Sequence, residues 1–276
     1  MEISIIINHY KSPEVLKMCL NYLSDWKKEF EAEGKKAEII VTDSETIPET
    51  RALMNDKFSD IQFIAEPKNV GFGKSVNRAL KKAQGEYVFI INADLIIADP
   101  KELNKMLEYL KNNPNVGIIG PALRNFDETH QPSAFRYYTP LLIILRRTPF
   151  GRTRWGKKKI EEFMLRDVKN LLSEPKEVDW LMGSALLTKK EHLDKIGLFD
   201  ERYFMYMEDV DLCRRFWESG LKVIYYPHSV MYHFHGGASR SKNMLKSLSN
   251  KYTRTHIASA YKYFRKHGLK KVRHGI

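Results

Sequence analysis

The first 121 residues alternate between short apolar runs and longer segments in which apolar residues recur at helical spacing. Helical spacing predicts a helix from Ser12-Pro13 to a stop at Gly34, and further helices over residues 72–83 and 100–111. Unbroken apolar runs, typical of strands buried on both faces of a parallel sheet, occupy residues 3–7, 37–42, 61–65, 87–91 and 116–119. This alternation predicts an α/β fold with a doubly wound, mostly parallel sheet flanked by helices.

The pattern changes after residue 121. Residues 122–178, which are rich in Arg, Pro and aromatic residues, are predicted to be irregular. The remaining segments predict a strand over 178–187, a helix over 208–219, a strand over 223–226 and a long basic amphipathic helix over 242–266. We therefore expect one continuous α/β domain over residues 1–240 and a C-terminal helical extension over residues 241–276.

Four polar side chains follow predicted strands: Asn8, Asp43, Glu66 and Asp94. Doubly wound sheets bind ligands at the carboxyl ends of their strands, so these residues predict one shared cleft. Asp94 interrupts the apolar sequence FIINADLIIADP, where a polar side chain costs free energy unless it has a partner. We therefore expect Asp94 to hold a partner.

The charge of the chain widens the choice of partners. The formal net charge is +12, and basic residues are dense in residues 146–159 and 240–276. Nucleic acid, anionic lipid and phosphorylated small molecules all fit this charge, as does a solvated basic surface. The apolar run at 141–145 is too short to span a bilayer, and the chain enters its first strand without a signal peptide. We expect a cytoplasmic chain that could touch a membrane but does not cross it.

Several common site motifs are absent. The sequence GFGKSVN contains a GKS, but a P-loop needs glycine where the chain has Lys68, and a dinucleotide fingerprint needs glycine where it has Val76. Cys19 and Cys213 lack CxxC partners, which argues against zinc and disulfides. No helix-turn-helix, zinc-finger or RNA-recognition pattern is evident, so nucleic acid is not an expected partner.

Six stretches carry a family resemblance when they are taken together and in order. They are SIIINHYKSPEVLKMCLNYL, VTDSE, EPKNVGFGKSVNRAL, FIINAD, DWLMGSALLTKKEHLDKIGLFDERYFMYMEDVDLCRRFWESG and YYPHSVMYHFHGGAS. Over roughly residues 2–240 the chain resembles an inverting family 2 glycosyltransferase with the GT-A fold, especially its bacterial rhamnosyltransferase-like branch. The resemblance implies a nucleotide-binding half over 1–121 and an acceptor-binding and catalytic half over 122–240.

The resemblance implies a donor site at the sheet edge. In the family the acid that matches Asp43 hydrogen-bonds the nucleotide base, which suits uracil or thymine; the alternative is a solvated turn aspartate. The loop EPKNVGFGKSVN resembles the family segment NxGFxxxxN, although it could be a simple loop-to-helix connection. The implied nucleotide-sugar-binding residues are Asn8, Asp43, Asn69, Gly71, Asn77, Asn92 and His235.

The resemblance also implies a divalent cation. Asn92-Ala93-Asp94 stands where the family shows a DxD-like motif, and in the rhamnosyltransferase-like branch the first acid is commonly Asn. Asp94 would bind Mg²⁺ or Mn²⁺ bridging the donor pyrophosphate, and His233 would complete the site. The alternatives are a strand-end aspartate that caps the next turn and a structural histidine.

The second half is expected to supply the base and the acceptor site. Within MEDVDLCRRF, the family motif points to Asp209 as the base that deprotonates the acceptor hydroxyl. Glu208 or Asp211 could instead carry that role or orient the acceptor, and acids in the first turn of a helix are also favoured by its dipole. Trp180, Gly183 and Glu208 are expected on the acceptor side, although Trp180 could equally belong to the core.

These expectations combine into one activity with two alternatives. The chain would transfer a sugar to a glycan or polyprenyl-linked glycan in cell-surface polysaccharide synthesis. The first prediction for that sugar is L-rhamnose, with dTDP-rhamnose as the donor. A UDP-hexose is the alternative donor, and a non-catalytic nucleotide-sugar-binding or nucleic-acid-binding protein is the alternative class. Residues 140–159 and the basic C-terminal segment would suit contact with anionic lipid on the inner face of the cell membrane.

Overall fold

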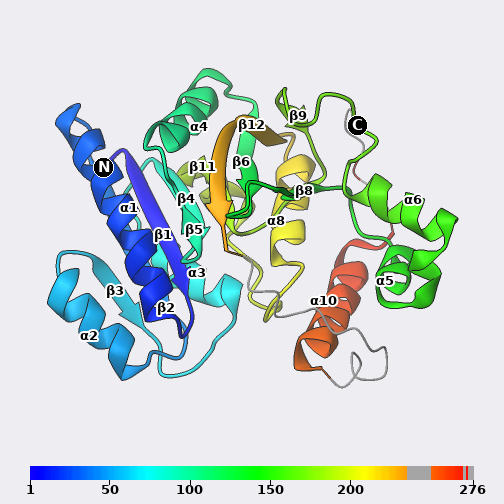
Figure 1. The fold of residues 1–276 in the computed structure, drawn as a ribbon, viewed down its shortest axis with the longest axis horizontal. Helices are drawn as coiled ribbons and strands as arrows, with labels where there is room; N and C mark the ends of the chain where they lie inside the picture. The colour runs from blue at the N-terminus through cyan, green and yellow to red at the C-terminus, as the bar shows by residue number, and fades with distance from the viewer. Residues whose placement is uncertain (235–249, 270–271, 273–276) are drawn as a thin grey trace.

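The computed structural model describes residues 1–234, 250–269 and 272, whose arrangement is shown in Figure 1. The large mixed sheet has the order β3-β2-β1-β4-β11-β6-β12-β5, with β7 beside β6 and β9 beside β12, while β8 and β10 form a separate pair. The strands are β1 (Ile3–His9), β2 (Ala37–Asp43), β3 (Gln62–Ala65), β4 (Tyr87–Asn92), β5 (Leu95–Ile96), β6 (Val116–Arg124), β7 (His130–Gln131), β8 (Ala134–Phe135), β9 (Lys176–Glu177), β10 (Trp180–Leu181), β11 (Ala185–Lys189) and β12 (Lys222–His233).

The helices cover both faces of the sheet. They are α1 (Pro13–Ala32), α2 (Pro48–Lys57), α3 (Phe72–Leu80), α4 (Lys101–Asn112), α5 (Pro140–Arg147), the 3₁₀ helix η1 (Pro149–Arg152), α6 (Arg154–Phe163), α7 (Lys190–Ile196), α8 (Glu208–Glu218) and α10 (Lys251–His267). Neighbouring strand residues point to opposite faces, so Ile5 joins the apolar cluster of α1 and α4 while Ile6 joins that of α3 and α8. Burial on both faces explains why these strands are continuously apolar.

The predicted fold class is confirmed, with a mixed second half. Strands β3, β2, β1 and β4 are parallel neighbours, and β12 is parallel to β6. In contrast, β11 runs antiparallel to both β4 and β6. The predicted strand over 178–187 is in fact β10 and β11. They are separated by a turn in which the Met182 amide donates to Ser133 O, just before β8 (2.8 Å), and Ser184 O accepts from the Asn92 amide (3.2 Å).

The prediction that residues 122–178 are irregular is wrong, because this segment contains α5, η1 and α6. Two threonine caps start its helices: Oγ1 of Thr139 accepts from the Leu142 amide and Oγ1 of Thr153 from the Gly156 amide, both at 3.1 Å. Pro140 occupies the first turn of α5. The Arg-rich and aromatic composition of this segment led to the prediction of an irregular structure, although these local signals for helix starts are present. Helices α2 and α7 were also not predicted.

The C-terminal helix is confirmed, but it packs as part of the domain. Residues 242–249 of the predicted helix lie outside the described residues, and α10 begins at Lys251. Ala260 and Tyr263 are buried in the same apolar cluster as Val210 and Phe216 of α8. The extension expected after residue 240 is therefore docked against the second half. Of the described helices, none combines the length and apolar character needed to cross a membrane.

Candidate active site

Neighbouring strands bring the polar strand-end residues to one edge. Asn8 on β1 stands opposite Asn92 on β4, and His9 stands opposite Asp43 on β2. The side-chain Oδ1 atoms of Asn8 and Asn92 are both buried and have no hydrogen-bond partner among the described residues. Glu66 follows β3 but is buried in an ion pair with Arg78. Glu66 is therefore already engaged by the protein, whereas Asn8 and Asn92 each keep a buried oxygen that a ligand could use.

Asp43 has one oxygen engaged by the protein and one without a partner. Nε2 of His9 accepts a hydrogen bond from the Ser12 amide at 3.0 Å, so in the neutral ring Nδ1 carries the proton. That Nδ1 donates to Oδ1 of Asp43 at 2.7 Å. Oδ2 of Asp43 is buried without a hydrogen-bond partner among the described residues. A buried carboxylate oxygen that lacks a donor costs free energy, and an imide N–H of a nucleotide base would satisfy it.

The loop before α3 packs on the loop before α8. Gly71 has φ +89° and ψ 157°, a conformation essentially confined to glycine. A Cβ atom there would lie 2.4 Å from the carbonyl oxygen of Phe204, and the Phe72 amide donates to that oxygen at 3.1 Å. Oδ1 of Asn69 accepts from the Gly71 amide at 2.9 Å. The close approach that requires this glycine is thus made to the protein's own backbone.

Asn77 serves the same loop–loop contact, which changes its predicted role. Its Oδ1 accepts from the Phe199 amide (3.0 Å), and its Nδ2 donates to Phe199 O (2.9 Å) and to Glu201 (3.1 Å). The side chain is buried. Since these bonds use both ends of the amide, they favour a role for Asn77 in positioning the second-half loop over the predicted contact with a nucleotide.

Asp209 lies against the turn between β10 and β11. Its Oδ2 accepts from the Gly183 amide at 3.0 Å across 26 residues of sequence, and its Oδ1 accepts from the Val210 amide at 2.9 Å. Burial raises the pKa of Asp209 above the usual range, although these amides act to lower it. A raised pKa makes the carboxylate a stronger base, which is what deprotonation of a hydroxyl requires.

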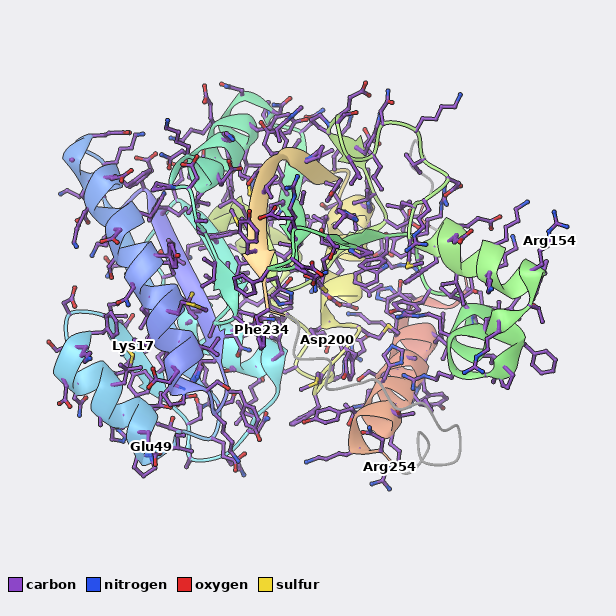
Figure 2. The ribbon with its side chains drawn as sticks, in the orientation of Figure 1. Lys17, Glu49, Arg154, Asp200, Phe234 and Arg254 are labelled. Atoms are coloured by element: carbon purple, nitrogen blue, oxygen red, sulfur yellow. The ribbon has the colours of Figure 1, made fainter. Side chains whose placement is uncertain are left out.

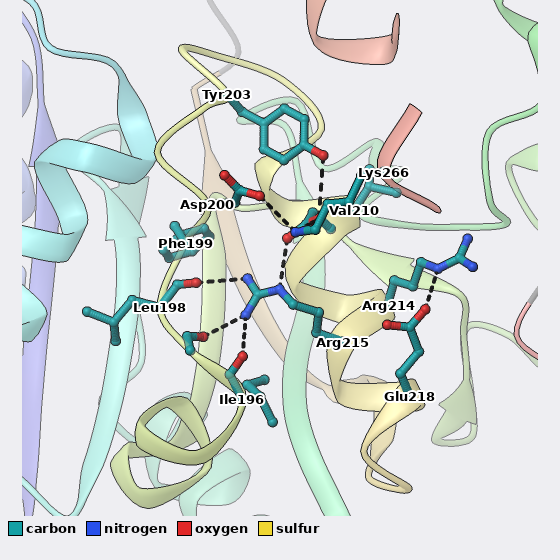
Figure 3. Close-up of polar contacts among 12 residues, drawn as sticks. Ile196, Leu198, Phe199, Asp200, Tyr203, Val210, Arg214, Arg215, Glu218 and Lys266 are labelled. Carbon is teal, nitrogen blue, oxygen red and sulfur yellow. Dashed lines mark hydrogen bonds and ion pairs between the residues drawn. The ribbon is translucent and has the colours of Figure 1, made fainter. Parts of the chain in front are cut away.

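The two neighbouring acids are less suited to that task. Glu208 is buried, and both burial and the charge of Asp209 raise its pKa strongly, so its carboxyl group favours the neutral form. Asp211 is fully buried and contacts Arg215, Lys266 and His267 at 2.6–2.8 Å. Burial would raise the pKa of Asp211, but hydrogen bonding from His267 and the charges of Arg215 and Lys266 keep it lowered. Figure 3 shows two of these basic residues, Lys266 and Arg215, and the guanidinium of Arg215 also donates to the carbonyl oxygens of Ile196 and Leu198.

Asp94 and His233 meet where β5 pairs with β12. Leu95 stands opposite His233, and the Phe234 amide donates to Asp94 O at 2.9 Å. Oδ1 of Asp94 lies 3.2 Å from Nε2 of His233. Figure 2 shows the adjacent Phe234 near the centre of the molecule, between the two halves. The pair predicted from residues far apart in the sequence is therefore brought together.

The chemistry of this pair suits a cation. Nδ1 of His233 lies 2.8 Å from Oε1 of Gln131, so in the neutral ring Nδ1 donates and Nε2 directs its lone pair towards Asp94. A carboxylate oxygen and an imidazole nitrogen that face each other are common ligands of Mn²⁺. Across the described residues no group of three His, Cys, Asp or Glu could hold a metal ion. Oxygen atoms of a bound diphosphate would have to supply the remaining ligands.

A short chain of hydrogen bonds links Asp209 to the pair formed by Asp94 and His233. Gly183 binds Asp209, and the carbonyl oxygen of the next residue, Ser184, accepts from the amide of Asn92, two residues before Asp94. The ring of Phe72, next to Gly71, lies 3.5 Å from the position of a Cβ on Gly183. The loop before α3, the end of β4 and the start of α8 therefore converge on one region.

The prediction that Trp180 lines the acceptor side is not supported by its surroundings. Trp180 is buried, its Nε1 donates to Arg136 O at 2.8 Å, and its ring stacks on Phe135 (4.5 Å) and Tyr138 (5.6 Å). The alternative, a core residue, is what the structure has. His235 lies outside the described residues, so its predicted contact with the donor stays a prediction.

Sequence reasoning missed two residues that position the site. Gln131 orients His233, and Lys266 neutralises Asp211 two residues from Asp209. Each acts across a long sequence separation, 102 residues for Gln131 and 55 for Lys266. No local pattern marks either residue, so only the tertiary fold reveals them.

Comparison with known proteins identifies relatives over most of the chain. The N-acetylglucosaminyl-diphospho-decaprenol L-rhamnosyltransferase of Mycobacterium tuberculosis is 28% identical over 246 residues, covering 82% of this chain and 75% of its own. Rhamnosyltransferase WbbL of Escherichia coli is 26% identical over 209 residues, covering 70% and 69%.

Solved structures agree on the fold. GalNAc-T7, crystallised with UDP, GalNAc and Mn²⁺, superposes with a TM-score of 0.62 at 13% identity, over 98% of this chain and 55% of its own. The mannosyltransferase PcManGT of Pyrobaculum calidifontis, in complex with GDP-Man and Mn²⁺, gives 0.58 at 17% identity, over 94% and 69%. The chain thus spans about half of the longer GalNAc-T7 structure. The model of glycosyl transferase family 2 matches residues 4–196, and the chain therefore belongs to that family.

Proposed function

We propose that this glycosyltransferase moves one sugar from a nucleoside diphosphate donor to a hydroxyl group of a glycan or lipid-linked glycan, with inversion at the anomeric carbon. The observation that carries the proposal is Asp209, a carboxylate with a raised pKa that is fixed by the Gly183 amide beside the end of β4. A single displacement needs one base and no covalent intermediate, and Asp209 fits that requirement. The bacterial rhamnosyltransferases support the reaction class.

For the donor, we propose that Asp43 reads the base. Its Oδ2 would accept the imide N–H that uracil and thymine share, so Asp43 alone does not separate UDP from dTDP. The rhamnosyltransferase relatives favour dTDP-rhamnose as the first donor to test, with a UDP-hexose as the alternative. Asn8 and Asn92, whose side-chain oxygens have no partner at the same edge, would bind donor hydroxyl groups.

For the cofactor, Asp94 and His233 would hold Mg²⁺ or Mn²⁺ together with diphosphate oxygens, and the imidazole favours Mn²⁺. The structures of two fold relatives contain Mn²⁺. The bound cation would neutralise the charge of the departing diphosphate. Gln131 would keep Nδ1 of His233 protonated, so that Nε2 remains a ligand.

In the proposed reaction Asp209 takes the proton of the acceptor hydroxyl. The acceptor oxygen forms a bond to the anomeric carbon while the bond from that carbon to the diphosphate oxygen breaks, and the electron pair leaves with the nucleoside diphosphate. Glu208 is buried and favours the neutral form, so it opposes the charge of Asp209 little. We therefore reassign Glu208 from acceptor contact to positioning of the base.

Donor binding and turnover test the proposal separately. A thermal-shift screen of dTDP-rhamnose, UDP-hexoses and GDP-mannose, each with and without Mn²⁺, should show stabilisation by a preferred donor that increases with the metal. That donor should then be hydrolysed or transferred by the wild type and not by Asp209→Asn. Binding without turnover by the wild type would favour the non-catalytic alternative, and no donor binding would overturn the proposal.

A further inference from the structure

Helices α5 and α6 form a compact hairpin at the end of the molecule opposite α1 and α2 (Figure 1). Two glycines allow its parts to touch. A Cβ at Gly151 would lie 2.1 Å from Leu145 O, and a Cβ at Gly156 would lie 2.2 Å from Phe150 O. Leu142 and Leu145 point inward and are buried. The close backbone contacts at Gly151 and Gly156 therefore fix the relative positions of α5, η1 and α6, and with them the outward surface of the hairpin.

Four large apolar side chains of this hairpin are exposed to solvent. Leu141 and Ile144, three residues apart on α5, are 47% and 53% exposed. Phe150 on η1 is 68% exposed, and Trp155 at the start of α6 is 52% exposed. Scattered apolar residues are ordinary on a surface, but four within one small hairpin mark an interaction site.

The same hairpin carries unneutralised positive charge. Arg152, Arg154, Lys157 and Lys158 are exposed, and none of them forms an ion pair with a described residue. A shallow hollow on α6 is lined by Arg154, Trp155, Lys157, Lys158 and Glu161. Figure 2 shows Arg154 at the outer edge of the molecule. Cations beside an exposed indole are arranged as in an interfacial membrane segment.

We propose that this surface, made of the four apolar and four basic side chains just described, docks on an anionic lipid bilayer. The aliphatic pair Leu141 and Ile144 finds no complement on nucleic acid, where aromatic stacking and charge dominate. A second copy of the chain would place like charges face to face. Acyl chains accept the apolar side chains, while lipid phosphates meet the Lys and Arg heads. The proposal stands apart from glycosyl transfer and goes beyond it.

Vesicle binding by the full chain tests this proposal. In co-sedimentation, phosphatidylglycerol-containing vesicles should bind the wild type at least about tenfold better than pure phosphatidylcholine vesicles, and added salt should weaken binding. Phe150→Ser with Trp155→Ser should lower binding about tenfold or more. Arg154→Gln, Lys157→Gln and Lys158→Gln together should lower it on the order of a hundredfold. Brominated lipids should quench the tryptophan fluorescence of the wild type more than that of Trp155→Phe.

Matched changes on α1 control for lost charge and lost apolar surface. Met18 and Tyr22 are 36% and 41% exposed there, and Lys17, Lys27 and Lys28 provide three charges. Met18→Ser with Tyr22→Ser, and Gln at the three lysines, should leave vesicle binding unchanged. Equal losses in these controls, no wild-type binding at low salt, or tighter binding of a short RNA than of vesicles would each overturn the proposal. Soluble donor binding should be unchanged in every patch variant, so failure here would leave the proposed reaction untouched.

Discussion

Nζ of Lys266, near the end of α10, lies 2.6 Å from Oδ1 of Asp211 on α8, although 55 residues separate them. Lys266 also bonds Asp200 at 2.8 Å, and Ser259 of the same helix donates to Met205 O at 2.8 Å. The C-terminal helix α10 is therefore bonded both to α8, which carries Asp209, and to the loop that precedes α8. From the other half of the molecule, Asn77 holds the same loop.

Asp211→Asn should destabilise the fold strongly. Asp211 is fully buried, and its loss leaves Arg215 without its carboxylate and Lys266 with Asp200 alone, which costs about 3–5 kcal/mol of unfolding free energy. Lys266→Met should cost less, about 1.5–3 kcal/mol, because Asp211 keeps Arg215, His267 and the Tyr203 hydroxyl as partners. Lys262→Met, one turn away, is the control and should change little, because among the described residues its ammonium group bonds only to Arg202 O. Urea unfolding measures all three.

The pH dependence of the Asp211 contribution has a definite sign. Because its pKa is lowered in the folded state, the stability it adds is present above the unfolded carboxyl pKa of about 3.9 and is lost as the pH falls below it. The difference between wild type and Asp211→Asn should therefore shrink in acid. A difference that stayed constant down to about pH 2 would contradict the assigned ion network.

Gly71→Ala should destabilise the contact between the two halves. Its φ of +89° is strained for alanine, and the new Cβ would meet Phe204 O, which together cost about 2–4 kcal/mol. Gly34→Ala is the matched control: its φ is +79°, but nothing lies within 4 Å of its Cβ, so only strain of about 1–2 kcal/mol is expected. Equal urea midpoints for the two variants would show that the contact with Phe204 is not tight.

Local chemistry made part of this arrangement predictable. Strand ends are marked by apolar runs that stop at Asn8, Asp43 and Asp94, and parallel strands necessarily bring such ends together. The start of the acidic helix is likewise a local signal. Family motifs marked Asp209 and Gly183 separately, but the hydrogen bond between them is seen only in the structure.

The predictions that the structure does not favour concern side chains whose contacts depend on distant partners. Asn77 looks available in its own loop, but its amide is used by Phe199, 122 residues away. Trp180 lies in a predicted strand, whose side chains alternate between two faces. Spacing alone does not show that the face with Trp180 packs against Phe135 and Tyr138 and is not open to a ligand. The docking of α10 is invisible to a pattern that marks only its amphipathic character.

Asp209→Asn should abolish transfer and leave donor binding intact. Removal of the base should lower kcat by about 10²–10⁴-fold, with donor affinity unchanged in calorimetry. Because burial raises the pKa of Asp209, the wild-type rate should fall in acid with a midpoint clearly above pH 3.9, the ordinary aspartate value of about 3.9 being the reference. An acidic limb at or below that value would contradict Asp209 as the base.

Glu208→Gln should change the pH dependence of stability. The raised pKa of Glu208 means that the folded chain binds more protons than the unfolded chain between about pH 4.3 and the folded value. Wild-type stability should therefore fall across this window as pH rises. Urea unfolding at about pH 5 and 8 should show the wild type losing at least about 1 kcal/mol relative to Glu208→Gln. Parallel behaviour at both pH values would contradict a buried neutral acid.

Gln131→Ala should weaken cation binding without removing a ligand. Oε1 of Gln131 holds Nδ1 of His233 at 2.8 Å, and loss of such an orienting bond typically lowers metal affinity about 10–100-fold. His233→Ala and Asp94→Ala should lower it further, since each removes a proposed ligand. Calorimetric titration with Mn²⁺ in the presence of dTDP or UDP measures the metal affinity of each variant. Gln84→Ala, at an exposed position, is the control. If Gln131→Ala bound Mn²⁺ like the control while His233→Ala did not, the orienting role would be wrong. If all the variants matched the wild type, the cation would lie elsewhere, because no loss of a true ligand leaves affinity unchanged.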